Sequence, residues 1–347
     1  MERNSKLKTI LRNGNSISIS RYINLCLYEK NIGYYHNKKI GLDFTTSPEI
    51  SQMFGECISI FIVSIFKKIG KINNFCELGP GNGTLMKDLI KSLSAFLGNK
   101  INFFLFEKSN RFSVNSIFKD YKEFSIKKIK KLSFPSQPFF FFCNEFFDAL
   151  PINQFEKKNN IWFERRVKFE NNKLSLILKK NAFFKTISEN PNGSILEISP
   201  LKKLYLSKIF NHLSQFGGGF LIFDYGPFSK KKIDTIQSIY NGRKSNFLEN
   251  THESDITYHI DFEYIKKVAK KFNLHFYGPI SQKRFLYFSG INERFLMLSK
   301  NSDSRSKIEQ LHSQFTRLTD PSGIGGLIKC VLITKENPEL SFFNARS

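Results

Sequence analysis

The chain has 347 residues, of which 41% are hydrophobic, so it is too apolar for a disordered protein and long enough for two domains or one elaborated domain. Its formal net charge is +23, but its lysines are scattered in pairs rather than gathered in one basic run, which argues against a nucleic-acid partner. The 5 cysteines lie singly, without the spacing of a zinc site, and no apolar run is long enough to cross a bilayer. We therefore expect no metal and no stable membrane insertion, while the oligomeric state stays open.

The N-terminal part of the chain predicts two helices. Residues 17–31 read as a short helix. A second helix is expected to begin at Ser47-Pro48-Glu49, because an N-cap serine, a proline at the first helical position and an acid in the first turn are typical of a helix start. Apolar side chains then recur at helical spacing as far as Ile69, and Gly70 is expected to end this helix.

Beyond residue 70, apolar strands alternate with helical segments. A helix is predicted over residues 84–97, ending at Gly98. This alternation is typical of an α/β fold with a doubly wound, mostly parallel sheet, in which ligands bind at the carboxyl ends of the strands. The core strands are predicted at Ile72–Leu78, Ile101–Phe106, Phe139–Cys143 and Gly218–Phe223.

Two segments interrupt this alternation. Residues 161–179 predict a hairpin with a Glu-Asn-Asn turn, and residues 230–300 are too long for one crossover, so we expect a substrate-binding insertion there. The chain then divides into four expected parts. These are a helical segment that closes the site over 1–70, a core over 71–229, the insertion over 230–300 and C-terminal strands that complete the sheet over 301–347.

The strand that ends at Leu78 runs into a glycine-rich loop, Glu77-Leu78-Gly79-Pro80-Gly81-Asn82-Gly83-Thr84. Glycine lets the backbone turn sharply and lets a ligand come close to it, and the following helix offers unpaired N–H groups. The loop therefore predicts a nucleotide-like cofactor. A dinucleotide fingerprint would have its third glycine one residue later, where Thr84 stands, so the spacing favours the first motif of class I S-adenosylmethionine methyltransferases.

Glu107 lies 24 residues after Gly83, at the end of the second predicted strand. An acid at this place can accept hydrogen bonds from ribose hydroxyls, both in dinucleotide enzymes and in methyltransferases. The alternative is a surface glutamate at a strand end. Because the glycine loop lies at the right distance, we favour a ribose contact and hence an adenosine-type ligand.

The segment Asn144-Glu145-Phe146-Phe147-Asp148-Ala149-Leu150-Pro151 follows the next core strand. Glu145 and Asp148 would point the same way if this segment began a helical turn. In methyltransferases of this class the position faces the transferred methyl group and the acceptor, so both acids are candidate catalytic residues. The alternative is a structural helix cap supplied by Asn144.

Basic residues are missing from four stretches, although the chain contains 53 of them. Burial explains part of this, since Lys and Arg are rarely buried. The same stretches carry acidic side chains, which predicts a local negative pocket suited to a cationic substrate. The alternative is that the acids are helix caps and first-turn residues, which fits Glu49 best. The stretches are 40–66, 132–156, 209–229 and 245–264.

Several further segments resemble one known family along most of the chain, from about Ser16 to Thr334. The most specific one is the stretch from Asp43 to Glu56. Together with the glycine loop, these segments resemble the MidA family, whose mitochondrial members are complex I assembly factors. The other matching segments are Gly33–Tyr35, Asn144–Pro151, Gly193–Pro200, Asp224–Gly226, Leu248–Asn250, Asp255–Thr257 and His259–Phe262.

The resemblance implies a class I methyltransferase fold, S-adenosyl-L-methionine as cofactor, and symmetric methylation of an arginine on the 49-kDa-type subunit of respiratory complex I. It makes Glu145 the first candidate for gripping the guanidinium and Asp148 the second. Glu49 is a further candidate catalytic residue, which closes the site together with Asp43. The candidate cofactor contacts are Thr45, Thr46, Glu77, Gly79, Gly81, Gly83, Thr84, Glu107 and Asn144.

The sequence departs from the family pattern around the entrance to the site, where the loop before Asp43 is short, Leu42 replaces a glycine and Tyr258 replaces a small residue. Because the matched region begins close to Met1, we expect a bacterial cytoplasmic protein, with the mitochondrial matrix as the alternative. Two rival functions remain open at this point. One is a non-catalytic complex I assembly chaperone, and the other is an NAD-linked oxidoreductase.

Overall fold

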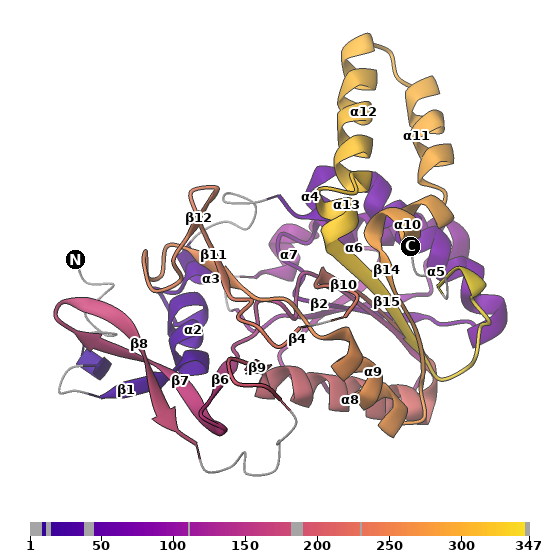
Figure 1. Cartoon of the computed structure of the whole chain (residues 1–347). Helices are drawn as coiled ribbons and strands as arrows, with labels where there is room; N and C mark the ends of the chain where they lie inside the picture. Colours follow the sequence, from indigo (N-terminus) through magenta and orange to yellow (C-terminus); the bar gives the residue numbers. More distant parts are fainter. Residues whose placement is uncertain are drawn as a thin grey trace. The chain divides into compact units, whose positions relative to one another are not determined.

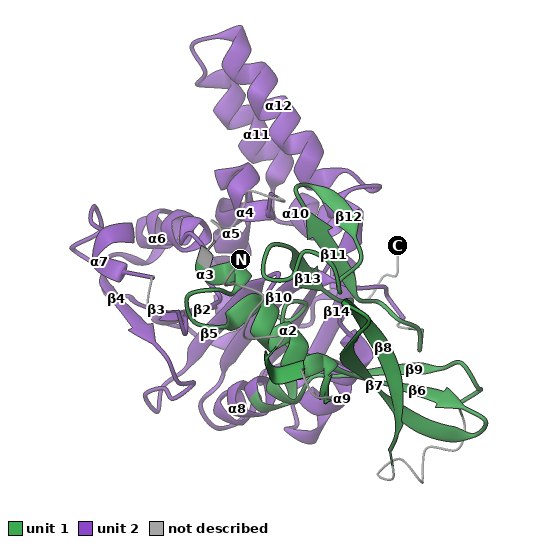
Figure 2. Ribbon diagram, turned by 90° about the vertical axis from the view of Figure 1, so that its left-hand side faces the viewer, with its two compact units in different colours: residues 1–44, 147–204, 231–259 green, residues 45–146, 205–230, 260–347 purple. Residues whose placement is uncertain are grey.

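The computed structural model describes residues 9–11, 15–37, 45–109, 112–181, 190–229 and 231–343. The chain forms two compact units, which Figure 2 shows in different colours. Both units are assembled from separate stretches of sequence, and the stretch expected as one insertion over 230–300 is divided between them after residue 259. Unit 1 comprises residues 1–44, 147–204 and 231–259, and unit 2 comprises residues 45–146, 205–230 and 260–347.

Unit 2 is built around a seven-stranded sheet in the order β14-β15-β10-β5-β2-β3-β4. The strands from β10 to β4 run parallel, whereas β15 runs antiparallel to both of its neighbours. The predicted α/β class with a mostly parallel sheet is confirmed, and the four predicted core strands lie side by side within it. The strands are β2 (Asn74–Leu78), β3 (Asn102–Phe106), β4 (Ser125–Ile129), β5 (Phe139–Asn144), β10 (Gly218–Tyr225), β14 (His275–Ser281) and β15 (Ile328–Thr334).

Both faces of this sheet are buried, which explains the four consecutive phenylalanines of β5. Side chains alternate between the faces of a strand, so two of these rings lie on each face. The rings of Phe139 and Phe141 lie 5.3 and 5.8 Å from the ring of His212, which comes from helix α8 (Pro200–Phe216). Phe140 and Phe142 belong to the hydrophobic cluster on the other face.

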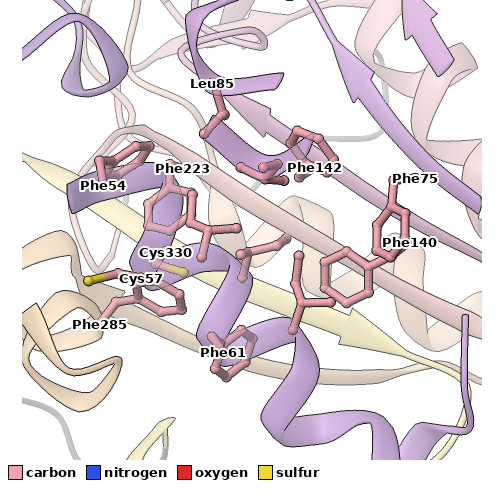
Figure 3. Close-up of a cluster of buried hydrophobic side chains, with 14 of the residues drawn as sticks. Phe54, Cys57, Phe61, Phe75, Leu85, Phe140, Phe142, Phe223, Phe285 and Cys330 are labelled. Atoms are coloured by element: carbon pink, nitrogen blue, oxygen red, sulfur yellow. The ribbon is translucent and has the colours of Figure 1, made fainter. Parts of the chain in front are cut away.

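That cluster is the main core of unit 2, and Figure 3 shows part of it. Its central helix is α5 (Gln52–Ile69), whose Phe54 and Phe61 pack edge-on against Phe223 and Phe285 with ring centroids 5.1 and 5.0 Å apart. Aromatic pairs in this geometry add to the stabilisation that comes from burying their area. These contacts pack α5 against the end of β10 and against Phe285.

The single helix predicted from Ser47 is in fact two helices, because the chain is extended at Ser51, with a φ of −162° and a ψ of 143°. The Ser51 hydroxyl accepts a hydrogen bond from the N–H of Met53 and so starts α5. Thr46, rather than Ser47, is the N-cap residue of the short first helix, α4 (Ser47–Ile50). Gly70 ends α5 as predicted.

Figures 1 and 2 both show α11 (Ile291–Lys300) and α12 (Arg305–Thr319) as an antiparallel pair that projects away from the sheet of unit 2. None of the helices in the described ranges is long and apolar enough to cross a membrane. The remaining helices of unit 2 are α6 (Thr84–Leu97), α7 (Val114–Ile117), α9 (Phe262–Lys271), α10 (Gln282–Phe288), α13 (Ile324–Leu327) and the 3-10 turn η2 (Ser341–Phe343).

Unit 1 contains a five-stranded and a three-stranded sheet. The predicted hairpin is confirmed, and its turn residues Asn171 and Asn172 have φ values of 49° and 60°, as a two-residue hairpin turn requires. The predicted helix near residues 17–31 is present as α2. The elements are β1 (Ser16–Ser18), α2 (Ile19–Tyr28), α3 (Tyr34–Asn37), β6 (Asn153–Lys158), β7 (Ile161–Glu170), β8 (Lys173–Lys180), β9 (Ile195–Ile198), β11 (Gln237–Tyr240), β12 (Arg243–Ser245) and β13 (Asp255–Thr257).

Candidate cofactor and acceptor site

The glycine loop of unit 2 joins the end of β2 to the start of α6. Gly79, Gly81 and Gly83 have φ values of 69°, 55° and 80°, a region that side chains other than glycine adopt at a cost. The N-cap residue of α6 is Gly83 itself, so no N-cap side chain closes the first turn of this 14-residue helix. The loop therefore presents backbone N–H groups and the positive end of the helix dipole to a ligand.

Glycine is also required by close packing around this loop. A Cβ atom at Gly79 would lie 2.6 Å from the Phe146 ring. A Cβ atom at Gly83 would lie 2.8 Å from the side chain of Ile117. Both distances are below any real contact, so the loop cannot carry side chains at these two positions without moving its neighbours.

Glu107 follows the carboxyl end of β3, directly beside the loop. The N–H of Gly79 donates to the carbonyl of Phe106 at 3.1 Å, which joins the two strand ends. The Glu107 carboxylate accepts a 2.6 Å hydrogen bond from the N–H of Ser109, so its orientation is fixed. This places a partly buried acid next to the glycine loop, where a ribose contact would need one.

Glu77 lies within β2 and is only 3% exposed. Burial, and then the charge of Asp88, raise the pKa of Glu77 from 4.5 to about 8. Its Oε2 atom has no hydrogen-bond partner among the residues that the structure describes. A buried carboxyl oxygen without a hydrogen-bond partner destabilises the folded chain. A cationic ligand group beside Glu77 would favour its ionised form and give this oxygen a partner.

Asn144 and Glu145 follow the end of β5, next to the loop strand. The Glu145 backbone is held by a 2.9 Å hydrogen bond from its N–H to the carbonyl of Phe223. Its φ of 50° is the left-handed conformation, which costs a residue with a side chain about 1–3 kcal/mol and is concentrated at functional sites. The Nδ2 of Asn144 donates to Glu145 Oε1 at 2.9 Å, while Asn144 Oδ1 is buried without a partner in the described part of the chain.

The helical turn considered for residues 144–151 does not form. The N–H of Leu150 bonds instead to the carbonyl of Phe147 at 3.3 Å, so the segment is a turn. Glu145 belongs to unit 2 and Asp148 to unit 1. The helical spacing that would align their side chains is therefore absent.

Asp148 is 2% exposed and lies within the core of unit 1. Its carbonyl accepts a hydrogen bond from the N–H of Tyr258 at 3.1 Å. Tyr35 donates its hydroxyl proton to Asp255 at 2.8 Å, and burial followed by the charge of Asp255 raises the pKa of Tyr35 well above 10. Asp148 adds to this effect, so unit 1 gathers carboxylates and tyrosines in one buried cluster.

The N-terminal candidates of unit 2 lie on or before α4. Thr45 and Thr46 are partly buried, and the Thr46 carbonyl accepts a hydrogen bond from the N–H of Glu49 at 3.0 Å. The Glu49 carboxylate accepts hydrogen bonds from Thr84 Oγ1 at 2.7 Å and Asn82 Nδ2 at 3.2 Å. Glu49 therefore contacts the glycine loop itself. Asp43, and the shortened loop before it, lie outside the described residues.

Sequence reasoning did not single out Asn82 or Asp88. Asn82 stands inside the loop motif, so the motif could have suggested it. Asp88 lies one turn into α6, where burial and then the charge of Glu56 raise its pKa from 3.8 to about 6. Nothing in the local sequence distinguishes Asp88 from an ordinary acid in a helix.

A family model described as S-adenosyl-L-methionine-dependent methyltransferase matches residues 57–280 of the chain. Among curated proteins, the chain is 28% identical over 368 residues to the mitochondrial protein arginine methyltransferase NDUFAF7 homolog of Caenorhabditis elegans, covering 93% of this chain and 85% of that protein. It is 28% identical to the mitochondrial protein arginine methyltransferase NDUFAF7 of Homo sapiens, covering 89% of this chain and 78% of the human protein.

Among solved structures, the chain resembles a protein from Burkholderia thailandensis that was crystallised bound to S-adenosyl-homocysteine. The TM-score is 0.83 at 20% sequence identity, with 96% of this chain and 91% of the other covered. A native crystal structure of a protein from the same organism gives a TM-score of 0.80, again at 20% identity and with the same coverage. At this identity the likeness shows a shared fold.

Proposed function

Because the chain belongs to the MidA family of S-adenosylmethionine-dependent methyltransferases, we propose that it methylates an arginine of a protein partner, namely the 49-kDa-type subunit of respiratory complex I. The relatives described above are named protein arginine methyltransferases, which supports arginine as the acceptor. We further propose that the product is symmetrically dimethylated and that the modification supports assembly of the complex. A methyltransferase has no use for a nicotinamide cofactor, so the oxidoreductase reading is set aside.

The observation that supports S-adenosylmethionine as the cofactor is that the buried Oε2 atom of Glu77, beside the glycine loop, is unpaired among the described residues. The cofactor supplies a methyl group on a sulfonium centre and carries an ammonium group. The buried Glu77 carboxyl and the N–H groups of α6 fit its amino-acid part, and Glu107 fits its ribose. Asn144 Oδ1, buried without a partner among the described residues, offers a further acceptor at the neighbouring strand end.

Glu145 is the residue that we assign to the acceptor guanidinium. Arginine stays protonated in water, so it must be held in place and relieved of a proton before it can accept a methyl group. A carboxylate can grip the guanidinium and stabilise its charge. The strained backbone of Glu145, its partly buried position and its hydrogen bond from Asn144 fix one such carboxylate at the end of β5.

The charge of the chain makes such a carboxylate necessary. With a net charge of +23, the protein as a whole repels a guanidinium, so acids within about 8–10 Å must reverse the local potential. Asp148 is the second candidate for this role. It lies in the carboxylate and tyrosine cluster of unit 1. The substitution Asp148→Asn tests its role separately from that of Glu145.

The test is co-expression of the complex I subunit with the wild-type enzyme or with Glu145→Gln, followed by mass spectrometry of the subunit. The substitution keeps the shape of the side chain and removes its charge, so methylation should fall by about 10²–10⁴-fold while cofactor affinity stays near that of the wild type. Glu339→Gln is the matched control, because Glu339 is exposed and also has a left-handed φ, of 52°. Full arginine methylation with Glu145→Gln would refute the role of Glu145.

The place of the protein in the cell is part of the proposal. The relatives are named as mitochondrial, whereas the bias of this chain toward Phe, Ile, Asn and Lys suits a bacterium with an AT-rich genome. We propose a bacterial cytoplasmic location, with the mitochondrial matrix as the alternative. If the wild-type enzyme bound its cofactor but left the subunit unmethylated, the assembly-chaperone role would replace the arginine methyltransferase role.

A further inference from the structure

A line of buried hydrogen bonds in unit 2 connects α12 to α4. The side-chain Nε2 of Gln282, the first residue of α10, donates to the carbonyl of Leu318 at 3.0 Å. The Oε1 atom of the same side chain accepts a hydrogen bond from the hydroxyl of Ser47 at 2.8 Å. Ser47 and Gln282 are both 0% exposed, so neither side chain can exchange these partners for water.

Gln282 provides a hydrogen-bond donor for a carbonyl group at the end of α12. Leu318 lies in the last turn of this helix, where carbonyl groups have no partner within the helix. Gln282 supplies the missing donor inside the protein and still has an acceptor left for Ser47. Gln282 therefore links α4 to the last turn of α12, which belongs to the α11–α12 hairpin that projects in Figures 1 and 2.

From Ser47 the connection continues along the backbone of α4 to Glu49, an exposed residue whose side chain contacts the cofactor loop. Ser47 and Glu49 stand two residues apart on α4, a helix of 4 residues. Glu49 accepts from Asn82 and Thr84, which flank Gly83 at the start of α6. Because the extended Ser51 separates α4 from α5, α4 has little rigidity of its own and relies on its tertiary contacts.

We propose that Gln282, Ser47 and Glu49 are positioning residues for the cofactor loop. Gln282 anchors Ser47, Ser47 orients α4, and Glu49 on α4 holds the Thr84 hydroxyl and the Asn82 amide. The loop then presents its N–H groups in one fixed arrangement, which lowers the cost of ordering it when the cofactor binds. This role for Glu49 does not depend on which acceptor the enzyme methylates.

The first experiment measures the affinity for S-adenosylhomocysteine by calorimetry in Ser47→Ala and Gln282→Met. Each variant removes one member of the line without touching the loop. We expect the Kd to rise about three- to tenfold, as the loss of one buried hydrogen bond predicts. Hydrogen exchange at the amides of residues 79–87 should become faster, while exchange in β2 and β5 should not change.

Thr319→Val is the matched control. Thr319 is 6% exposed and lies next to Leu318, but its hydroxyl bonds to the Phe315 carbonyl within α12 and takes no part in the line. A similar small loss of thermal stability is expected in Thr319→Val and in the two test variants. If Thr319→Val raised the Kd as much as Ser47→Ala does, the effect would be general loosening and the proposal would be wrong.

A second experiment compares Glu49→Ala with Glu49→Gln. Glutamine keeps an acceptor oxygen for Thr84 and Asn82, so it should restore most of the affinity that alanine loses. In the double variant of Ser47→Ala with Glu49→Ala, the Kd should be no higher than in Glu49→Ala alone, because both changes break the same line. Fully additive losses, or a wild-type Kd in both Ser47→Ala and Gln282→Met, would overturn the proposal.

Discussion

The N–H of Gly79 donates a 3.1 Å hydrogen bond to the carbonyl of Phe106, which joins the turn after β2 to the end of β3. This bond brings together two features that are 28 residues apart in the sequence, the glycine loop and the acid that follows β3. A cofactor held by both would be fixed at its amino-acid end and at its ribose. Single substitutions can test each of these two contacts separately.

Gly81→Val is expected to abolish binding of S-adenosylhomocysteine. Gly81 has a φ of 55°, and a branched side chain there would both strain the backbone and stand where the ligand should meet it. Calorimetry and a thermal unfolding curve are the measurements. Gly98→Val is the control, because Gly98 has a φ of 74° with open space around it and lies at the far end of α6. Equal affinities in the two variants would contradict our assignment of the loop.

Glu107→Ala is expected to weaken cofactor binding by about 1–3 kcal/mol, since ribose hydroxyls would lose a charged acceptor. Methyl transfer at saturating cofactor should change far less. Glu123→Ala removes the same charge from an exposed position of unit 2 and serves as the control. A Glu107→Ala enzyme with normal affinity and no turnover would show that this acid serves the chemistry rather than the ribose.

The raised pKa of Glu77 predicts that the stability of the cofactor-free protein depends on pH. Its pKa rises from 4.5 to about 8 on folding, so the folded chain keeps a proton that the unfolded chain releases. This contribution is complete below pH 4.5 and is lost as the pH rises through about 8. The free energy of unfolding of the wild type should therefore fall relative to Glu77→Gln, by up to about 1.4 kcal/mol per pH unit inside that window. Denaturant titrations at several pH values measure the free energy of unfolding of both proteins. If it changed with pH in the same way in the wild type and in Glu77→Gln, the prediction would be wrong.

The same residue predicts proton release when the cofactor binds. An ammonium group beside Glu77 favours the carboxylate, so the carboxyl must lose its proton on binding near pH 7. Calorimetry with S-adenosylhomocysteine in two buffers of different ionisation enthalpy should give different apparent heats for the wild type. In Glu77→Gln this difference should shrink. Equal heats for the wild type in both buffers would mean that Glu77 does not change its charge.

The elements that could be predicted from the sequence are those with local signals at their ends. Helix α6 begins and ends as predicted because Gly83 and Gly98 punctuate it, and the β7–β8 hairpin follows from its two asparagines. The break between α4 and α5 was missed because the apolar periodicity continues through Ser51, whose hydroxyl could equally serve inside a helix or cap one.

The contacts that give the candidate site its geometry could not be predicted in this way. Glu49 reaches Thr84 across 35 residues, and Ser47 reaches Gln282 across 235, so tertiary packing rather than local sequence decides both. The left-handed backbone of Glu145 has no signal in its own sequence either, and its N–H bonds to Phe223 of the neighbouring strand β10, far along the chain. The family resemblance identified these segments, but it did not indicate which residues their side chains contact.

The most direct test of arginine methylation is a reconstituted reaction. The purified complex I subunit, isolated from cells that lack this enzyme, is incubated with the enzyme and S-adenosylmethionine that carries a deuterated methyl group, and mass spectrometry locates the label. We predict label on an arginine side chain, rising to two methyl groups placed symmetrically. Label on a residue of another type, or no label from an enzyme that binds S-adenosylhomocysteine normally, would contradict the proposal.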